Sequence, residues 1–181
     1  MTATPATLPS KLVTEFQWSR LASLKVLDLA CGSGRNGLWF LEQGCDVTFI
    51  DQDLSALSSL KHPKAQLLQW NLEDGTAPVL PEAAFDIVLV FNYLYRPLFP
   101  QIASSVKSQG IIVYETFTWR QAEIGRPRNP DFLLTEHELK SVFANWQPLH
   151  YFEGLLSDPF SGSQNFKAQL IALKQDVCPL Q

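Results

Sequence analysis

The chain has 181 residues, of which 46% are hydrophobic and 18% charged, so it suits one globular domain with a sizeable core and not a disordered chain. Its formal net charge of -4 argues against general binding to nucleic acid, which requires a basic face. No apolar run reaches the ~18 residues of a membrane span, and the N-terminus lacks the charged and apolar regions of a secretory signal.

Short apolar runs rich in Val, Ile and Phe alternate along the chain with segments of helical period. The fourth run, FDIVLVF, is almost continuously apolar, which is typical of a central parallel strand covered on both faces. The expected strands are Lys25–Leu29, Asp46–Ile50, Ala65–Trp70, Phe85–Phe91, Gly110–Thr116, Gln147–Leu155 and Phe166–Leu173.

Helices are expected between these strands. Ser10–Leu21 is the first candidate, lying over the ligand edge of the sheet, and Asn36–Gln43 is the second, ending before Gly44. The third helix is predicted from the spacing of Leu54, Leu57 and Leu60. The fourth is predicted from a face shared by Leu98, Ile102 and Val106, and it closes at Gly110. The fifth is predicted from a capping box of Thr135 and Glu138, which precedes the apolar residues Leu139, Val142 and Phe143.

This alternation predicts an α/β fold: a doubly wound, Rossmann-like, seven-stranded sheet, mostly parallel with an antiparallel last strand. The connector SDPFSGSQN is too short for a helical crossover, so the last two strands should pair antiparallel. We expect one domain over residues 1–181, with residues 1–24 as an N-terminal cap helix region. The segment 117–134 is too long for a simple connection and is interpreted as an active-site loop.

The stretch LDLACGSGRNG contains a G-x-G-x-x-G at Gly32, Gly34 and Gly37, which alone is a weak sign of dinucleotide binding. Asp28, at the end of the first strand, would repel a pyrophosphate and suits a ligand that presents a cation, as S-adenosylmethionine does with its sulfonium and α-ammonium. The alternative is that Asp28 caps the following turn. Asp51 ends the second strand, where a carboxylate binds a ribose diol in either type of cofactor.

The segment VLDLACGSGRNGLWFLEQG resembles the first motif of the class I S-adenosylmethionine-dependent methyltransferases, and VTFIDQD resembles their second. QWNLEDG and FDIVLVFNYLYRPLF are similar to the segments after strands three and four, so the resemblance covers most of the chain. Within the superfamily, the chain loosely resembles the small tellurite-resistance-type methyltransferases. It departs at Ala30, where glycine is more usual, and at Asn71, where an acid often accepts the adenine amino group; an Asn carbonyl oxygen accepts the same bond.

The resemblance implies S-adenosylmethionine as cofactor and S-adenosylhomocysteine as product. It assigns the glycine loop to the methionine moiety, the end of the second strand to the ribose, and the segment after the third strand to adenine. The cofactor-binding residues implied in this way are Asp28, Ala30, Gly32, Gly34, Asp51, Gln52, Asn71, Leu72 and Phe91.

Methyl transfer from a sulfonium has a good leaving group, so positioning is the main task. A general base is needed only for a protonated, hard acceptor. The acceptor should lie over the carboxyl ends of strands four and five, where Asn92, Tyr93 and Glu115 are the catalytic candidates. Glu115 has three open roles: a base, a site for a cationic group, or a buried partner of an arginine.

Four of the six arginines fall near the same strand ends, and with Tyr95 they are the candidate substrate-binding residues: Arg96, Arg120, Arg126 and Arg128. Guanidinium groups bind carboxylates and oxyanions bidentately, which favours a small anionic acceptor. The alternative is that the arginines pair with Glu115, Glu123 and Asp131 and stabilise the loop. The sequence leaves both interpretations open.

Asn92 lacks the following prolines of the amino-methylating enzymes, which, with the net charge of -4, argues against a nucleic-acid base as acceptor. A protein or a small-molecule acceptor stays open, and we expect a small molecule. His62, His137 and His150 have no metal-ligand spacing, so no metal is expected. Three cysteines without C-x-x-C spacing indicate a reducing, cytoplasmic setting, and Cys31 is interpreted as a packing residue. Two other functions stay open: an NAD(P)-dependent oxidoreductase and a non-catalytic S-adenosylmethionine-binding regulatory module. Nothing in the sequence predicts an oligomeric state.

Overall fold

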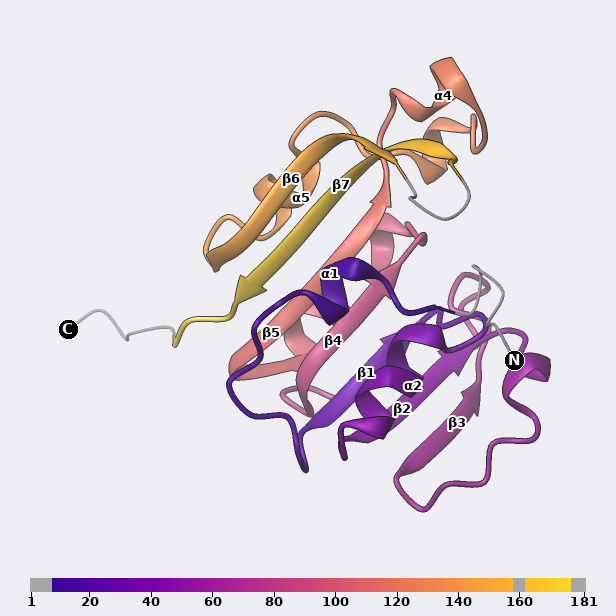
Figure 1. Ribbon diagram of the computed structural model, residues 1–181, viewed down its shortest axis with the longest axis vertical. Helices are drawn as coiled ribbons and strands as arrows, with labels where there is room; N and C mark the ends of the chain where they lie inside the picture. Colours follow the sequence, from indigo (N-terminus) through magenta and orange to yellow (C-terminus); the bar gives the residue numbers. More distant parts are fainter. Residues whose placement is uncertain (1–7, 158–161, 177–181) are drawn as a thin grey trace.

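The computed structural model describes residues 8–157 and 162–176, which form a seven-stranded sheet in the order β3-β2-β1-β4-β5-β7-β6 (Figure 1). Strands β1 to β5 pair in parallel, whereas β7 runs antiparallel to both β5 and β6. The expected α/β fold with its antiparallel end is therefore confirmed. The strands are β1 Lys25–Leu29, β2 Asp46–Asp51, β3 Ala65–Gln69, β4 Phe85–Phe91, β5 Val106–Phe117, β6 Gln147–Ser157 and β7 Gln164–Leu173.

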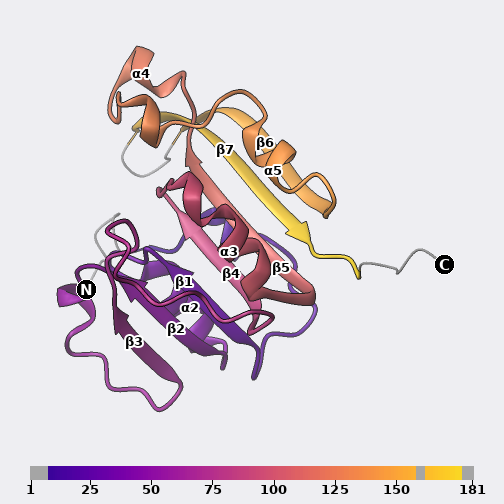
Figure 2. The same ribbon diagram turned by 180° about the vertical axis from the view of Figure 1, so that it is seen from behind.

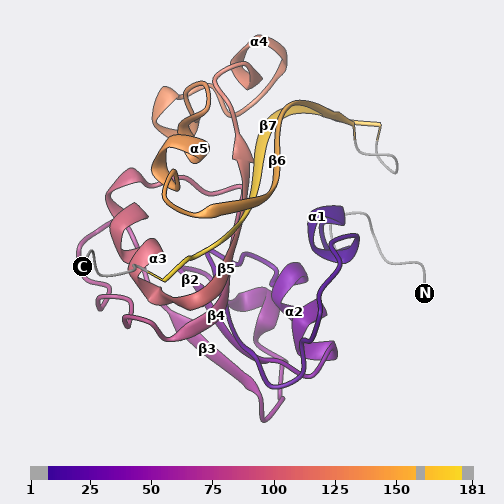
Figure 3. The same cartoon turned by 90° about the vertical axis from the view of Figure 1, so that its left-hand side faces the viewer.

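Short helices cover both faces of the sheet: α1 and α2 lie on one face, and α3 and α5 lie on the other (Figures 2 and 3). The α-helices are α1 Lys11–Thr14, α2 Arg35–Glu42, α3 Phe99–Ser105, α4 Gln121–Ile124 and α5 Glu138–Val142. The described residues also form the 3₁₀ turns η2 Ser55–Leu57, η3 Arg96–Leu98 and η4 Pro130–Phe132. The segment 117–134 thus contains α4 and η4, and a bridge between Thr118 and Leu134 ties its ends together. Residues 158–161 of the expected connector loop lie outside the described residues.

Strand β4 is the centre of the core, as its continuous apolar sequence indicates. Ile87 and Leu89 pack on the α2 side, and Val88 and Val90 pack on the α3 side. All four side chains are at most 1% exposed. Because successive side chains of a strand point to opposite faces, this strand requires cover on both sides.

Two predicted helices are much shorter than their sequences indicated. The helix over Leu54–Leu60 is only the turn η2, where the Ser58 hydroxyl donates to the Ser55 carbonyl; such bonds compete with helix formation. The helix over Ser10–Leu21 stops at Thr14, because the indole of Trp18 donates to the Val13 carbonyl that a further helical turn would use.

The other two differences occur at helix ends. The helix with Leu98 and Ile102 ends at Ser105, since Val106 already pairs with Phe85 as the first residue of β5. The last helix begins at Glu138 with His137 as its N-cap. The Glu138 carboxylate accepts from the Thr135 backbone N–H at 2.8 Å, which is the glutamate half of the predicted capping box.

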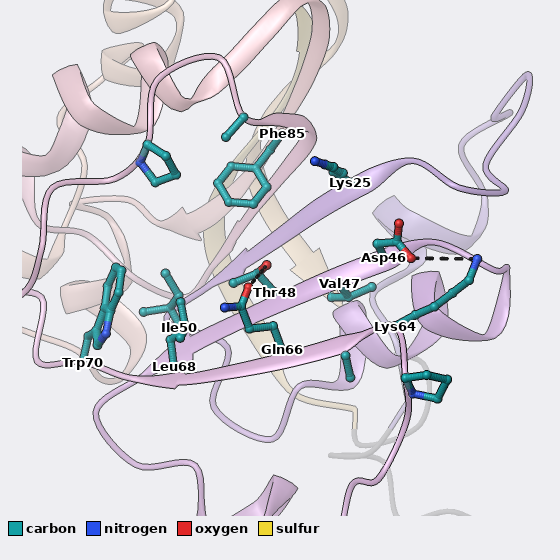
Figure 4. A pocket seen from close by; sticks show the side chains of 14 residues that line it. Lys25, Asp46, Val47, Thr48, Ile50, Lys64, Gln66, Leu68, Trp70 and Phe85 are labelled. Atoms are coloured by element: carbon teal, nitrogen blue, oxygen red, sulfur yellow. Dashed lines mark hydrogen bonds and ion pairs between the residues drawn. The ribbon is translucent and has the colours of Figure 1, made fainter.

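No helix lies between β3 and β4, and the sheet is hollowed beside this crossover (Figure 4). The hollow has a volume of about 440 Å³, and its walls include Thr48, Ile50, Leu68 and Trp70. It lies on the face opposite α2 and, apart from Trp70, shares no lining residue with the pockets at the carboxyl ends of the strands. The missing helix therefore leaves part of the α3 face uncovered.

Helix α2 approaches β2 closely at Gly37. A Cβ at this position would lie 2.7 Å from Asp28 Oδ2 and still nearer to the Phe49 ring. The third glycine of the G-x-G-x-x-G therefore serves helix–strand packing and needs no phosphate to explain it.

We expect Gly37→Ala to lower the free energy of unfolding by about 1–3 kcal/mol, as overpacking of a close-packed core does. Urea denaturation followed by circular dichroism measures the change. Ser33→Ala, at an exposed position of the same loop, is the matched control and should be near neutral. Equal stability of the two variants would show that α2 shifts freely away from β2.

Candidate functional site

The loop between β1 and α2 is built from left-handed backbone. Ala30, Gly32 and Gly34 have φ of 51°, 54° and 70°. Glycine adopts this region without strain and alanine does not, which explains why glycine is usual at the position of Ala30. Nothing lies within 4 Å of a Cβ built on Gly32, whereas one on Gly34 would lie 2.9 Å from the Leu57 side chain. Gly32 therefore borders open space, and Gly34 serves packing.

Asp28, near the end of β1, fixes this loop through a hydrogen bond to α2. Its side chain is 3% exposed, and Oδ2 accepts from the Gly37 backbone N–H at 2.8 Å. Burial raises the pKa of Asp28 to about 7, although the bond from Gly37 and the charge of Arg35 act in the opposite direction. Asp28 thus caps the start of α2, which is the alternative left open by the sequence. Contact with a ligand ammonium stays a prediction.

The first pocket at the carboxyl edge of the sheet has a volume of about 320 Å³. Five of its lining residues were predicted to bind the cofactor: Ala30, Asp51, Gln52, Asn71 and Leu72. The other residues of its wall are Trp70, Glu73, Asp74 and Tyr93. The structure therefore brings the expected ribose and adenine positions together around one cavity.

Backbone donors orient the polar side chains of this pocket. Asp51 Oδ2 accepts from Gly32 N–H at 2.7 Å and Oδ1 from Asp53 N–H at 3.0 Å. Asn71 Oδ1 accepts from the Glu73 N–H at 3.0 Å. Asp51 is thereby fixed at the pocket wall, and the carbonyl of Asn71 already has one backbone partner.

A second pocket of about 350 Å³ adjoins the first, and the two share Glu73 and Tyr93. Its remaining walls are Asn92, Leu94, Phe117, Pro127 and Phe132. The Tyr93 hydroxyl is the one buried side-chain oxygen or nitrogen without a hydrogen-bond partner among residues 8–157 and 162–176. Burial, reinforced by the charge of Glu73, raises the pKa of Tyr93, so its phenol stays protonated.

Glu115 pairs with a lysine and not with an arginine. Its carboxylate accepts from Lys167 Nζ at 2.8 Å and from Gln169 Nε2 at 2.7 Å, and Lys167 also donates to Asn92 Oδ1 at 2.7 Å. The ion pair is buried, with side-chain exposures of 12% for Lys167 and 6% for Glu115. Lys167 and Gln169 were missed by the sequence analysis, although two polar residues at alternate positions of an otherwise apolar strand were a usable signal.

The four candidate arginines lie outside the lining of both pockets. Arg96 donates to both carboxylate oxygens of Glu138 at 2.7 and 2.9 Å and to the Leu133 carbonyl. Arg120 lies 3.7 Å from Glu123 and stacks over the Phe166 ring, and Arg128 donates to the Gly125 carbonyl. Arg126 is exposed. Arg96 and Arg120 thus make the loop-stabilising type of contact, with Glu138 as a partner that the sequence did not suggest.

Two further candidates lie next to the pockets. Phe91 is 8% exposed and packs in the core cluster that contains Phe49 and Val113. The Tyr95 hydroxyl approaches the Glu73 carbonyl at 3.5 Å, so it supports the segment that both pockets share.

The described residues contain no group of three His, Cys, Asp or Glu side chains that could hold a metal. Burial raises the pKa of the Cys31 thiol, with the charges of Asp28 and Asp51 adding to the effect, so the thiol stays neutral. Within the same residues, no helix has the length and hydropathy needed to cross a membrane.

Comparison with known proteins finds similarity to methyltransferases. Residues 26–110 match the family model described as "Methyltransferase domain". The chain is 30% identical over 149 residues to the probable S-adenosyl-L-methionine-dependent methyltransferase TehB of Haemophilus influenzae, covering 75% of this chain and 50% of TehB. It therefore spans about half the length of this curated relative.

Solved structures agree on the fold. The crystal structure of TehB from Haemophilus influenzae matches with a TM-score of 0.66 at 22% identity, covering 86% of this chain and 59% of that one. A putative S-adenosylmethionine-dependent methyltransferase from Listeria monocytogenes matches with a TM-score of 0.70 at 18% identity, covering 92% and 97%. The sheet order is that of a Rossmann-like α/β domain, and residues 26–110 carry the methyltransferase-domain match. In sequence and in fold the chain is similar to S-adenosylmethionine-dependent methyltransferases.

The raised pKa of Asp28 predicts a pH-dependent stability. An acid whose pKa is 3.8 unfolded and about 7 folded binds more protons in the folded state between these values. The free energy of unfolding should therefore fall as pH rises from about 4 to 7, by up to about 1.4 kcal/mol per pH unit.

Urea denaturation at several pH values tests this expectation, with Asp28→Asn as the reference that cannot titrate. The wild type should lose stability relative to Asp28→Asn as pH rises through the window. A difference between the two proteins that stays constant with pH would show that Asp28 is already ionised in the folded state at low pH.

Proposed function

We propose that this chain transfers the methyl group of S-adenosylmethionine to a small acceptor held over the carboxyl ends of β4 and β5. The observation that carries the proposal is the pair of adjoining pockets. One is lined by the predicted cofactor residues, the other by Asn92 and aromatic side chains, and Tyr93 lies in both. Two cavities that share a wall suit a donor and an acceptor that must meet in line.

The charges of the first pocket fit this cofactor. Its wall carries Asp51, Glu73 and Asp74, and the described residues contribute no basic side chain to it. Carboxylates favour a ligand with a sulfonium and an ammonium and disfavour the pyrophosphate of a dinucleotide. When bound, S-adenosylmethionine supplies an electrophilic methyl group. Asp51 would hold its ribose, Asn71 and Leu72 its adenine, and the open space at Gly32 would admit its methionine part.

The chain's own contribution is orientation. The Tyr93 phenol, protonated and unpartnered, would donate a hydrogen bond to a ligand at the junction of the pockets. Phe117 and Phe132 would exclude water from the acceptor. Both oxygens of Glu115 accept bonds from Lys167 and Gln169, which supports a positioning role over that of a base.

The alternatives lack comparable support. An oxidoreductase would need room for a pyrophosphate at a loop surrounded by carboxylates, and its G-x-G-x-x-G signal loses weight because Gly37 serves packing. A non-catalytic binding module explains the first pocket but not the second.

The melting temperature should rise by about 5–10 °C with S-adenosylmethionine or S-adenosylhomocysteine at ~100 times the dissociation constant. NAD and NADP should have no effect. Asp51→Ala should abolish the shift because it removes the carboxylate at the ribose position, whereas Asp46→Ala, at the opposite end of β2, should retain it. A shift with NAD or NADP alone would end the methyltransferase proposal.

A separate experiment tests the hypothesis that the acceptor is anionic, which the arginines suggested. Pro127 lines the second pocket, in which we place the acceptor, so its neighbours Arg126 and Arg128 are the arginines best placed to bind an anion. Arg126→Leu or Arg128→Leu should lower the turnover of oxyanions such as tellurite or selenite and leave the stability within about 0.5 kcal/mol.

Arg96→Leu is the contrasting variant. It should lower the free energy of unfolding by about 1–3 kcal/mol, since it removes the cation and both guanidinium hydrogen bonds from the half-buried Glu138 carboxylate. Full activity in all three variants, with uncharged acceptors preferred, would exclude anion binding by these arginines.

A further inference from the structure

The side chain of Asn92 is held in one orientation. Asn92 follows β4 with a left-handed φ of 54°, its N–H donates to the Glu115 carbonyl at 2.8 Å, and its Oδ1 accepts from Lys167 Nζ at 2.7 Å. An ammonium group only donates hydrogen bonds. The carboxamide oxygen must therefore face Lys167, and the NH₂ group lies on the other side.

Lys167 is itself fixed by a directional chain of hydrogen bonds. It donates to Glu115 Oε1, and Gln169 Nε2 donates to Glu115 Oε2. Because the Gln169 NH₂ group donates to Glu115, the amide oxygen of Gln169 faces His150, and its distance to His150 Nε2 is 3.1 Å. Since the Lys167 side chain is only 12% exposed and donates to both Asn92 and Glu115, reversing the Asn92 amide would leave the ammonium facing NH₂ donors, which is costly.

The Asn92 NH₂ group lies at the end of this series of hydrogen bonds. Within residues 8–157 and 162–176 it donates to no other group, and Asn92 is exposed where it lines the second pocket. Lys167 lies 4.9 Å from the centre of the Phe117 ring, which is part of the same wall. This side of the pocket thus presents hydrogen-bond donors backed by a buried cation.

We propose that Asn92, oriented by Lys167, is the specificity-determining residue for the acceptor and selects molecules that present an oxygen or another hydrogen-bond acceptor, carboxylates and oxyanions above all. A protonated amine is disfavoured at Asn92, because the oxygen that could accept from it already accepts from the Lys167 cation, which repels a second cation. The Glu73 carboxylate of the shared wall acts in the opposite direction, so the proposal requires the contribution of Asn92 to be the larger one. The proposal rests on the proposed function and names its substrate class. Lys167 acts through Asn92 and is a positioning residue.

The experiment uses the full chain loaded with S-adenosylhomocysteine and two probes of similar size, benzoate and benzylamine, titrated calorimetrically. The wild type should bind benzoate at least about tenfold more tightly than benzylamine, as expected for a hydrogen bond to a charged group. Asn92→Asp should reverse the preference, because its carboxylate still accepts from Lys167 but offers an oxygen to the pocket. This variant retains the Lys167–Glu115 pair and so should fold.

Lys167 variants test the positioning role. Lys167→Arg should keep the preference for benzoate, since a guanidinium also only donates. Lys167→Met should lose the preference because the amide can then turn, and Lys140→Met, on α5, is the matched control that should keep it. A merely structural role for Lys167 would change stability without changing the ratio of the two affinities.

The outcomes separate the two proposals. Failure of S-adenosylhomocysteine to bind the wild type contradicts the proposed function. Binding of S-adenosylhomocysteine, together with no benzoate binding, equal affinity for both probes, or an Asn92→Asp variant that still prefers benzoate, overturns the specificity role of Asn92 alone.

Discussion

The hydrogen bond from the Gly37 N–H to the buried carboxyl of Asp28 is the constraint on which the site depends. It ties the end of β1 to the start of α2, so the residues between them must turn within a short span, and they do so in left-handed conformations. The same approach of α2 to β2 places Asp51 where it accepts from Gly32. One buried bond thus contributes to the shape of the loop and to the orientation of the Asp51 carboxylate in the first pocket.

Strands could be predicted well because their signal is local and strong. Phe85–Phe91 has the predicted bounds, since a run that is apolar at every position but Asp86 favours a strand covered on both faces. Helices were less predictable, because leucine spacing does not report competing hydrogen bonds. The Trp18 indole that takes the Val13 carbonyl and the Ser58 hydroxyl that takes the Ser55 carbonyl both shorten helices whose periodicity is intact.

The residues of the candidate site also fall into a group that the sequence could predict and a group that it could not. Ala30, Asp51, Gln52, Asn71 and Leu72 lie at the last residue of a parallel strand or within three residues after it, so the position of each along the chain places it at the carboxyl edge. The partner of Glu115 could not be found by that rule. Lys167 lies near the beginning of β7, and only the antiparallel insertion of this strand beside β5 brings it to the edge. The pairing of strands that are far apart in the sequence, and not the local sequence pattern, decides that Lys167 pairs with Glu115.

The position of β7 also orders the assembly of the site during folding. The residues around the first pocket belong to the segment from β1 to just after β4, whereas Asn92 is held by Lys167, which enters the sheet with the last strand. Synthesis runs from the N-terminus, so the residues of the first pocket, Ala30 to Tyr93, emerge before Lys167 does. On the proposed function, a growing chain would carry the residues that hold the methyl donor before the lysine that orients the acceptor-selecting amide.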